Sequence, residues 1–493
     1  MNACDPACAS SVTVRSVKET LEREVKLRAD EGFELPPLAG EQLQPRVFVS
    51  TYHDTPDLRL ASAGATLRHR VENGLGLWQL KLPRGAARLE LESGGGPTTV
   101  PDELLRLLPA LTRRAGLAPV ARLRTRRVGV RVREDGRSLA DVVFDSVAVL
   151  EDQRVLRTWE ELEVELLDGD ERVLRRLEKA LRRAGAGDAE SRTKLARALA
   201  LPTPPTAPEA RTPADALRAM LALQLERMLA HDPGTRHGTD PEDLHQLRVA
   251  TRRLRAFLRA ARPLLEPMWA DELRAKLKWL GGALGPVRDL DVLLEHLRGE
   301  VATLDGEDRS AAESLLRRLE RERPPARDEM LAALDGDRYV ALLARLEDGT
   351  ASPRIVDEET PLASLWAREL RRLRRAAAEL DSDSPDEALH EARIRTKRAR
   401  YAAELAAGEL GKPGLRFVDS AKRLQDVLGE HQDAVVAEER IRALLTSAKA
   451  PAAHRAGGRL IERERARRAR ARDAFPSAWR KLDRAGKAAK AKA

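Results

Sequence analysis

Charged and apolar residues alternate along several short segments of the first 200 residues. Side chains two positions apart on a β-strand lie on the same face, so each segment would present one charged face and one apolar face. One such segment alone is usually an exposed strand. Repeated along the chain, with apolar faces that must pack, the pattern predicts a closed antiparallel β-barrel with a charged interior. The segments are 22–26, 68–70, 79–81, 90–92, 124–126 and 161–165.

The charged faces carry two kinds of side chain with different chemistry. Lysine and arginine are hydrogen-bond donors only and suit phosphate oxygens. The glutamates within 22–24 and 163–165 would repel phosphate unless a cation lay between, and a set of oxygen ligands favours Mg²⁺ or Mn²⁺. The interior is therefore expected to bind a metal-bridged polyphosphate and to transfer a phosphoryl group to water.

These segments resemble, in order, the motifs of the CYTH superfamily of triphosphate tunnel metalloenzymes. Glu-Arg-Glu-Val-Lys at 22–26 matches the ExExK signature. Further matches are Tyr-His-Asp-Thr at 52–55, Leu-Arg-His-Arg at 67–70, Trp-Gln-Leu-Lys at 78–81, Arg-Leu-Glu-Leu-Glu at 88–92, Arg-Thr-Arg at 124–126, Asp145, Glu-Val-Glu at 163–165 and Ser-Arg-Thr-Lys at 191–194. The resemblance covers residues 12–200. It departs from the family at His53, usually Phe, and at Arg124, often Lys.

The resemblance implies a role for each of these residues. Carboxylates would bind Mg²⁺ or Mn²⁺, cations would clamp a triphosphate, and two further acids would hold the cations in place or assist the metal. The implied metal ligands are Glu22, Glu24, Asp145, Glu163 and Glu165. The implied catalytic residues are Lys26, Arg68, Arg70, Lys81, Glu90, Glu92, Arg124, Arg126 and Lys194.

Beyond residue 200 the alternation ends and a helical pattern begins. The Pro-rich segment 201–213 can neither continue a helix nor join a sheet interior, which is typical of a linker. After it, apolar residues recur at spacings of three and four, which predicts an all-α domain. The expected fold class is α+β. The expected divisions are a disordered leader at 1–11, the barrel at 12–200, the linker, the helical domain at 214–480 and a basic tail at 481–493.

The helical region contains an internal repeat. Residues 245–255 recur at 390–400, shifted by 145 positions, and residues 278–289 recur at 422–433, shifted by 144. We therefore expect two pseudo-symmetric helical bundles, at about 214–350 and 360–480.

Each copy of the repeat places histidine and basic residues at i, i+3, i+7 and i+10, which is one face of a helix. The first stripe comprises His245, Arg248, Arg252 and Arg255, and the second stripe comprises His390, Arg393, Lys397 and Arg400. A solvated helix face with i,i+4 ion pairs is the plainer interpretation. Few acids lie on the stripes, however, and the spacing is repeated, which favours a binding surface.

The stripes and the LGxxxD elements that follow them resemble the CHAD domain, a conserved histidine α-helical domain, over about 213–480. The resemblance implies two helical bundles around a basic cavity that binds inorganic polyphosphate. The implied polyphosphate-binding residues are His245, Arg248, Arg252, Arg253, Arg255, Lys278, Arg288, His390, Arg393, Lys397, Arg398, Arg400 and Lys422.

The overall charge agrees with an anionic partner. The net charge is +9 and the isoelectric point is about 9.7. Nucleic acid is the rival partner, because residues 459–472 and the Lys-rich end are basic, but only 3% of residues are aromatic and stacking platforms are scarce. No segment is apolar enough to span a membrane, and the only cysteines are Cys4 and Cys8, so a cytoplasmic protein, in some settings granule-associated, is expected. The oligomeric state is left open.

Together the patterns predict a metal-dependent hydrolase of inorganic triphosphate or short linear polyphosphate, fused to a polyphosphate-binding helical domain. Two other functions fit parts of the pattern. A thiamine triphosphatase or a class IV-like adenylyl cyclase would share the tunnel but would need a pocket for an organic group. A non-catalytic, granule-associated polyphosphate-binding protein would need the stripes and none of the tunnel carboxylates.

Overall fold

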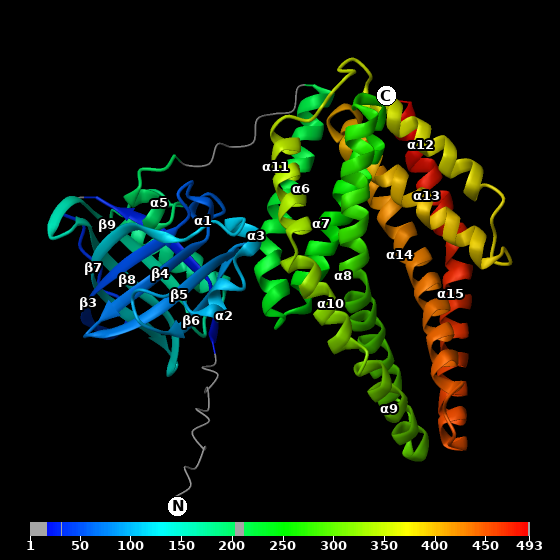
Figure 1. Ribbon diagram of the computed structural model, residues 1–493, viewed down its shortest axis with the longest axis horizontal. Helices are drawn as coiled ribbons and strands as arrows, with labels where there is room; N and C mark the ends of the chain where they lie inside the picture. The colour runs from blue at the N-terminus through cyan, green and yellow to red at the C-terminus, as the bar shows by residue number, and fades with distance from the viewer. Residues whose placement is uncertain (1–16, 31, 203–211, 492–493) are drawn as a thin grey trace, which may run out of the picture. The chain divides into compact units, whose positions relative to one another are not determined.

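The computed structural model describes residues 17–30, 32–202 and 212–491. The chain divides into two compact units, residues 1–206 and 207–493 (Figure 1). The leader expected at 1–11, with Cys4 and Cys8, and most of the linker expected at 201–213 lie outside the described residues. We describe each unit by itself.

The first unit is built on one nine-stranded antiparallel sheet. Its strand order is β1-β6-β5-β4-β3-β7-β8-β9-β2. The strands are β1 (Lys18–Glu22), β2 (Glu24–Ala29), β3 (Gly40–Asp54), β4 (Thr66–Glu72), β5 (Leu75–Arg84), β6 (Ala87–Gly94), β7 (Ala118–Glu134), β8 (Arg137–Glu151) and β9 (Arg154–Leu166). The expectation of an antiparallel sheet domain followed by a helical domain is confirmed.

The ladder of hydrogen bonds is not closed, in contrast to the closed barrel that we expected. Its two end strands, β1 and β2, follow each other in the chain and are separated only by Arg23. β1 pairs with β6, and β2 pairs with β9. Because β1 and β2 are successive parts of one extended segment, they cannot pair with each other. The backbone at Arg23, rather than a hydrogen-bonded pair, joins the two edges of the sheet.

The alternation along β9 separates a packed face from a charged face. Leu162 and Val164 are fully buried in a cluster that includes Leu174 and Leu177 of α4 (Glu171–Arg183). The intervening glutamates point to the other side, as the period of two requires. The short helices of this unit are α1 (Arg59–Ser62), α2 (Asp102–Leu105), α3 (Pro109–Thr112) and α5 (Lys194–Ala198).

The second unit is all helical. Its elements are α6 (Pro213–His237), α7 (Pro241–Ala260), η1 (Arg262–Leu264), α8 (Pro267–Ala302), α9 (Gly306–Glu320), α10 (Arg323–Asp335), α11 (Asp337–Ala351), α12 (Leu362–Ala377), α13 (Asp386–Leu405), α14 (Ala407–Leu445) and α15 (Pro451–Lys490). The repeated sequences fall on equivalent helices, with the stripes on α7 and α13 and the second element on α8 and α14. Apolar residues of α8, α9, α14 and α15 share one core, so the long helices join the two repeats.

The end of the chain differs from the separate basic tail that we expected from residue 481. Helix α15 continues to Lys490, and Leu482, Gly486 and Ala489 along its last turns are buried. A methyl group added at Gly486 would lie 3.1 Å from Leu370 of α12. The lysines of this segment are therefore the exposed face of a packed helix.

Candidate active site and basic stripes

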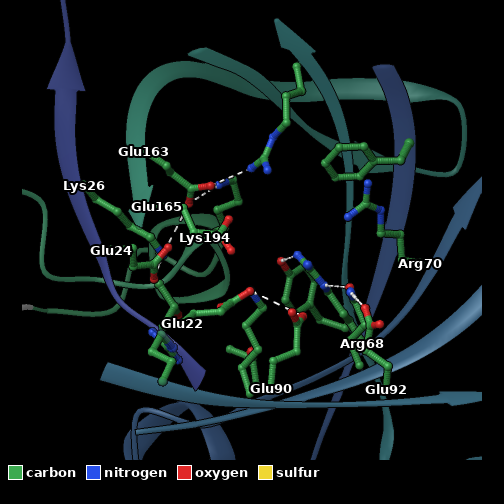
Figure 2. Close-up of a pocket in the computed structure, with 18 of the residues that line it drawn as sticks. Glu22, Glu24, Lys26, Arg68, Arg70, Glu90, Glu92, Glu163, Glu165 and Lys194 are labelled. Carbon is green, nitrogen blue, oxygen red and sulfur yellow. Dashed lines mark hydrogen bonds and ion pairs between the residues drawn. The ribbon is translucent and has the colours of Figure 1, made fainter. Parts of the chain in front are cut away.

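A highly charged pocket lies on the inner side of the sheet (Figure 2). Most of the residues that the sequence nominated line this pocket. They are Glu22, Glu24, Lys26, Arg68, Arg70, Lys81, Glu90, Glu92, Glu163, Glu165 and Lys194. Figure 2 shows the carboxylates of Glu22, Glu24, Glu163 and Glu165 on one side, with Arg68 and Arg70 on the other. The pocket can therefore present negative charge to a cation and positive charge to a phosphate.

The carboxylate side is set by the pairing of β2 with β9. Glu24 lies directly opposite Glu165, and Lys26 lies opposite Glu163. The Lys26 Nζ to Glu163 Oε1 distance is 3.4 Å. Like charges directly opposite each other destabilise a sheet unless a counterion separates them. The Glu24 and Glu165 pair is therefore a suitable place for a cation.

Glu165 is the carboxylate best suited to bind an ion. Within the described part of the chain it has no hydrogen bond or ion pair, whereas Glu22 accepts a 2.6 Å hydrogen bond from Lys81 and Glu24 lies 3.1 Å from Lys26. Burial, followed by the negative charge of Glu22, raises the pKa of Glu165 to about 7. A divalent ion with oxygen ligands would relieve this repulsion, so the donor set fits Mg²⁺ or Mn²⁺.

A second carboxyl group of the pocket also holds a proton near neutral pH. Burial raises the pKa of Glu90 to about 7, with a further upward contribution from its hydrogen bond with Glu22. Lys81 lies between these acids, 2.6 Å from Glu22 and 3.4 Å from Glu90. Glu92 accepts a 2.7 Å hydrogen bond from Gln79, whose Oε1 accepts one from Arg68, so Glu90 contacts Lys81 directly and Glu92 is linked to Arg68 through Gln79.

On the opposite side Arg68 is held by neutral groups, whereas Arg70 is held by an aromatic ring and by Glu72. Arg68 donates to Gln79 Oε1 at 2.8 Å and to the Tyr52 hydroxyl at 3.2 Å. The Arg70 guanidinium lies 3.7 Å from the ring centroid of Phe48 and donates a 2.6 Å hydrogen bond to Glu72 Oε2. Neutral acceptors fix a guanidinium without cancelling its charge, whereas a carboxylate compensates part of it. Arg68 therefore keeps its full charge for phosphate oxygens, and Arg70 shares its charge with Glu72.

The assignment of Arg124 and Arg126 to the interior is corrected by the structure. Both side chains are exposed on the other face of β7 and line a separate surface pocket. Arg127, one position further, points inward and lines the charged pocket. Faces alternate along a strand, and β7 pairs with β8 without a bulge between these residues, so only the odd-numbered positions here face the interior.

Arg127 is bound in a buried ion network. It donates two 2.7 Å hydrogen bonds to Asp145 and one of 2.5 Å to Glu163. Burial lowers the pKa of Arg127, but Glu163 and Asp145 raise it more, so that the net shift is upward. Asp145 is completely buried and lies behind the pocket lining rather than in it.

Asp145, Glu161 and Glu163 form a buried acidic cluster whose oxygens lie within 4.8 Å of one another, a geometry that could hold a metal ion. The ammonium of Lys194 lies among them, 3.0 Å from Asp145 and 2.7 Å from each glutamate. Thr193 caps α5 and so fixes Lys194 as its first residue. In this arrangement Lys194, Arg127 and Arg197 all pair with the cluster, so a metal ion there would have to displace them, whereas Glu165 has no such partner among the described residues.

Several pocket residues were missing from the residues nominated by sequence. They are Arg46, Arg88 and Arg127, and Glu161 of the buried acidic cluster was missing as well. Glu161 and Arg88 lie within motifs whose alternation places them on the charged face. Arg46 alternates with Phe48 and Ser50 along β3, and this mixture of residue types hides the inner face from a charge pattern.

In the helical unit, the two basic stripes meet. The charge of Arg252 on α7 acts on Arg393 and Lys397 of α13, together with Arg400 and the acid Asp433. Burial, then Arg393, Arg252 and Arg400, lower the pKa of Lys397 to about 7. Burial is the larger cause, and the contributions of Arg393 and Arg252 show that cations of both stripes lie near Lys397.

Other stripe residues extend this basic surface. Burial and then Arg288 lower the pKa of His245, and His390 Nδ1 lies 2.5 Å from Gln432 Oε1. Among the described residues, the buried Nε atoms of Arg288 and Arg393 have no hydrogen-bond acceptor. Buried donors without acceptors are costly and mark a place for an anion. Arg248 is paired with Asp289 at 2.6 Å.

Four residues that the sequence predicted to bind polyphosphate lie away from the two stripes. Arg253 donates to Glu404 at 2.6 Å and packs near Tyr401, so it joins α7 to α13. Arg398 lies among charges of α12 and α13, including Glu369, instead of on the second stripe. Lys278 is exposed on α8, and Lys422 is exposed and paired with Asp419 at 3.4 Å.

No helix in the described ranges combines the length and the apolar character needed to cross a lipid bilayer.

Comparison with known proteins agrees with a two-part architecture. The CYTH domain family matches residues 20–199 and the CHAD domain family matches residues 219–442. Two uncharacterized proteins of Mycobacterium tuberculosis strains are each 33% identical over 490 residues, covering 90% of this chain and 91% of the relative. The fold and site define a CYTH tunnel joined to a CHAD helical domain. The chain belongs to this CYTH and CHAD family.

Solved structures resemble one unit or the other. PptA from Streptomyces chartreusis is 25% identical, with a TM-score of 0.47, and covers 55% of this chain and 99% of its own. The CHAD domain from the plant Ricinus communis is 26% identical, with a TM-score of 0.46, and covers 56% of this chain and 94% of its own. A protein from Hippeastrum is described as a putative adenylyl cyclase with a dominant triphosphatase activity. It is 18% identical, with a TM-score of 0.26, and the match covers 38% of this chain and 97% of that protein.

Proposed function

We propose that the tunnel hydrolyses inorganic triphosphate or short linear polyphosphate in a reaction that depends on Mg²⁺ or Mn²⁺. The observation that carries this proposal is the division of one pocket into a carboxylate side and an arginine side. A linear phosphate chain with a divalent ion matches both sides. The free carboxylate of Glu165, whose pKa is about 7, supports a cation at this point.

The residues of the pocket would share the work of phosphoryl transfer. A divalent ion held by Glu22, Glu24 and Glu165 would polarise a phosphoryl oxygen and lower the pKa of a bound water. Arg68 and Arg70 would bind non-bridging oxygens and stabilise the charge that develops during transfer. Lys81 would contribute a point charge next to Glu22.

We further propose that the helical unit binds polyphosphate along the two stripes. Support comes from the convergence of Arg252, Arg393 and Lys397 and from the buried arginine donors without acceptors. Phosphate chains need only cations, and this surface offers them without a row of aromatic residues for bases to stack on. A cytoplasmic location and association with polyphosphate granules remain proposals that follow from this binding.

The test is a phosphate-release assay of the whole chain. The substrates are inorganic triphosphate, long-chain polyphosphate, ATP and thiamine triphosphate, each with Mg²⁺, with Mn²⁺ and with a chelator. We expect metal-dependent release that is fastest with inorganic triphosphate or short polyphosphate. Faster release from thiamine triphosphate, or cyclic AMP formed from ATP, would favour the organic-triphosphate alternative. Binding of polyphosphate without hydrolysis of any substrate would leave only the binding function.

A further inference from the structure

A second basic pocket lies at the end of α7, outside the region where the two stripes meet. It has a volume of about 410 Å³ and lies between α7 with η1, the first turns of α8, and α12. Its charged lining consists of Arg259, Arg262, Arg274, Arg368, Glu369 and Arg372. The segments that line it are not equivalent positions of the two repeats.

The first stripe leads into this pocket. Arg259 follows Arg252 and Arg255 at i+7 and i+4, so it continues the same face of α7. Burial and then the charge of Arg274 lower the pKa of Arg255, and Arg274 also acts on Arg259. From His245 to Arg259 the stripe spans 14 helical steps, a rise of about 21 Å.

Two glycines of α8 lie beside the first stripe. A methyl group added at Gly281 would lie 3.9 Å from Arg255 Nη1, and one added at Gly285 would lie 4.0 Å from Arg248 Nη2. These glycines are one helical turn apart, so α8 presents little side-chain bulk to this part of α7.

The pocket holds more positive charge than its own acids neutralise. Asp271 is bound to Arg262 at 2.8 Å and to Arg274 at 2.6 Å, and Glu369 is bound to Arg372 at 2.5 Å. In the described ranges, Arg259, Arg368 and Arg398 have no ion pair. Burial and then Arg398 lower the pKa of Arg259 to about 10, which shows that these cations repel one another.

The second stripe does not continue in this way. The residue 145 positions after Arg259 is Glu404. Glu404 accepts a 2.6 Å hydrogen bond from Arg253 and lies 3.5 Å from Arg400. The second stripe therefore ends at a carboxylate that neutralises it, whereas the first ends at an arginine that leads to further arginines. At this position the two stripes therefore carry opposite charge.

We propose that this pocket is an extension subsite for long polyphosphate. The bound chain would run from the place where the two stripes meet, along Arg255 and Arg259, to Arg368 in the pocket. This inference rests on the proposed polyphosphate binding by the helical unit. It adds that long chains gain affinity here and that short chains, which do not reach the pocket, gain none.

The experiment measures binding of long-chain polyphosphate and of tripolyphosphate to the full chain in the presence of a chelator. The variants are Arg259→Glu, which copies the second stripe, and Arg368→Glu, an exposed position of α12. The matched control is Arg321→Glu, an exposed position at the end of α9. We expect each pocket variant to weaken long-chain binding by about fivefold or more, with a smaller salt dependence, and to change tripolyphosphate binding by less than about twofold.

The outcomes separate this inference from the proposed function. If the wild type binds no long-chain polyphosphate, both are rejected. If it binds tightly but both pocket variants bind as the control does, the extension subsite is rejected and the stripes stand. Equal losses for tripolyphosphate and long chains would show a general charge effect and would also overturn the subsite. Tighter binding of duplex DNA than of polyphosphate by the wild type would contradict both.

Discussion

Cations in the two units of this chain lie in opposite electrostatic surroundings. In the tunnel, Glu163 raises the pKa of Lys26 against the effect of burial, and Glu161 and Glu163 do the same for Lys194. On the stripes, burial and neighbouring cations lower the pKa of Arg393 and Lys397. Lysine and arginine are therefore paired with acids in the first unit and lie beside other cations in the second.

This difference indicates how each unit would bind a phosphate chain. The pocket of the first unit is already ordered by its own ion pairs, and Glu165, a carboxylate without an ion pair among the described residues, is where a metal ion would add to them. The cations of the stripes repel one another until an anion binds between them. The stripes should therefore bind a phosphate chain without a metal ion. Arg70, whose pKa burial lowers to about 10, is the tunnel residue most like the stripes and faces the phosphate side.

The largest expected effect concerns Glu165, the carboxylate that we propose binds the divalent ion. Glu165→Gln should reduce metal-dependent triphosphate hydrolysis by roughly 10³, because the amide keeps the shape of the side chain but not the charge that holds a divalent ion. Glu24→Gln should behave in the same way. The control is Glu160→Gln on the outer face of β9. Near wild-type turnover of both tunnel variants at saturating Mg²⁺ would refute the metal assignment.

The next effect tests which face of β7 is internal. Arg68→Ala should slow triphosphate hydrolysis by about 10², and Arg68→Lys should restore little, because the planar fork is lost. Arg126→Ala should change the rate less than about twofold, since its side chain is exposed outside the pocket. Steady-state rates of the three variants decide the point. Arg68 lies on β4 and serves as the reference for an arginine inside the pocket, so a loss for Arg126→Ala as large as that for Arg68→Ala would show that Arg126, and not Arg127, is on the inner face of β7.

Sequence could predict the composition of the pocket better than its faces. Strands β2, β4, β6 and β9 carry charge at every second position, so the alternation identifies Glu24, Arg68 and Glu163 without a structure. At β7 the run Arg124 to Arg127 offers arginine to both faces. Only the pairing of Arg127 with Asp145 shows which face is internal.

The packing of the helical unit was less accessible from sequence. The repeat predicts two equivalent helices, and the structure places their stripes together. The sequence cannot show that Arg253 and Arg398 turn away from the stripes, because that depends on the crossing of α7 with α13 and α12. Nor does composition distinguish a basic tail from the last turns of α15, where every third or fourth residue is buried.

A smaller effect is expected from the stripes themselves. Arg252→Glu combined with Lys397→Glu should weaken polyphosphate binding in chelator by about tenfold or more, with a shallower dependence on salt, because fewer counterions are released. The control is Lys481→Glu combined with Lys490→Glu, two exposed positions of α15 with the same change of net charge. A salt titration of both double variants compares them directly. Equal losses would show that net charge, rather than the meeting of the stripes, governs binding.

The smallest effect is a proton taken up when polyphosphate binds. Lys397 has a pKa of about 7 instead of 10.5, so at pH 8 its side chain is mostly neutral in the free protein. Phosphate charge would restore the ammonium, and close to one proton (about 0.9) should be absorbed at pH 8. Binding calorimetry in buffers of different ionisation enthalpy measures this number. Lys397→Met should absorb none, and the same uptake in this variant would assign the proton to another group.

The same shift predicts how stability depends on pH. The unfolded chain protonates this lysine below pH 10.5, but the folded chain does so only below about pH 7, so the folded state loses stability as the pH falls between these values. Lys397→Met removes the cost of this charge. The free energy of unfolding of the variant should exceed that of the wild type at pH 7, and the gap should narrow as the pH rises towards 10.5. Urea unfolding at several pH values measures it, and a gap independent of pH would mean that burial of methionine, rather than relief of charge, stabilises the variant.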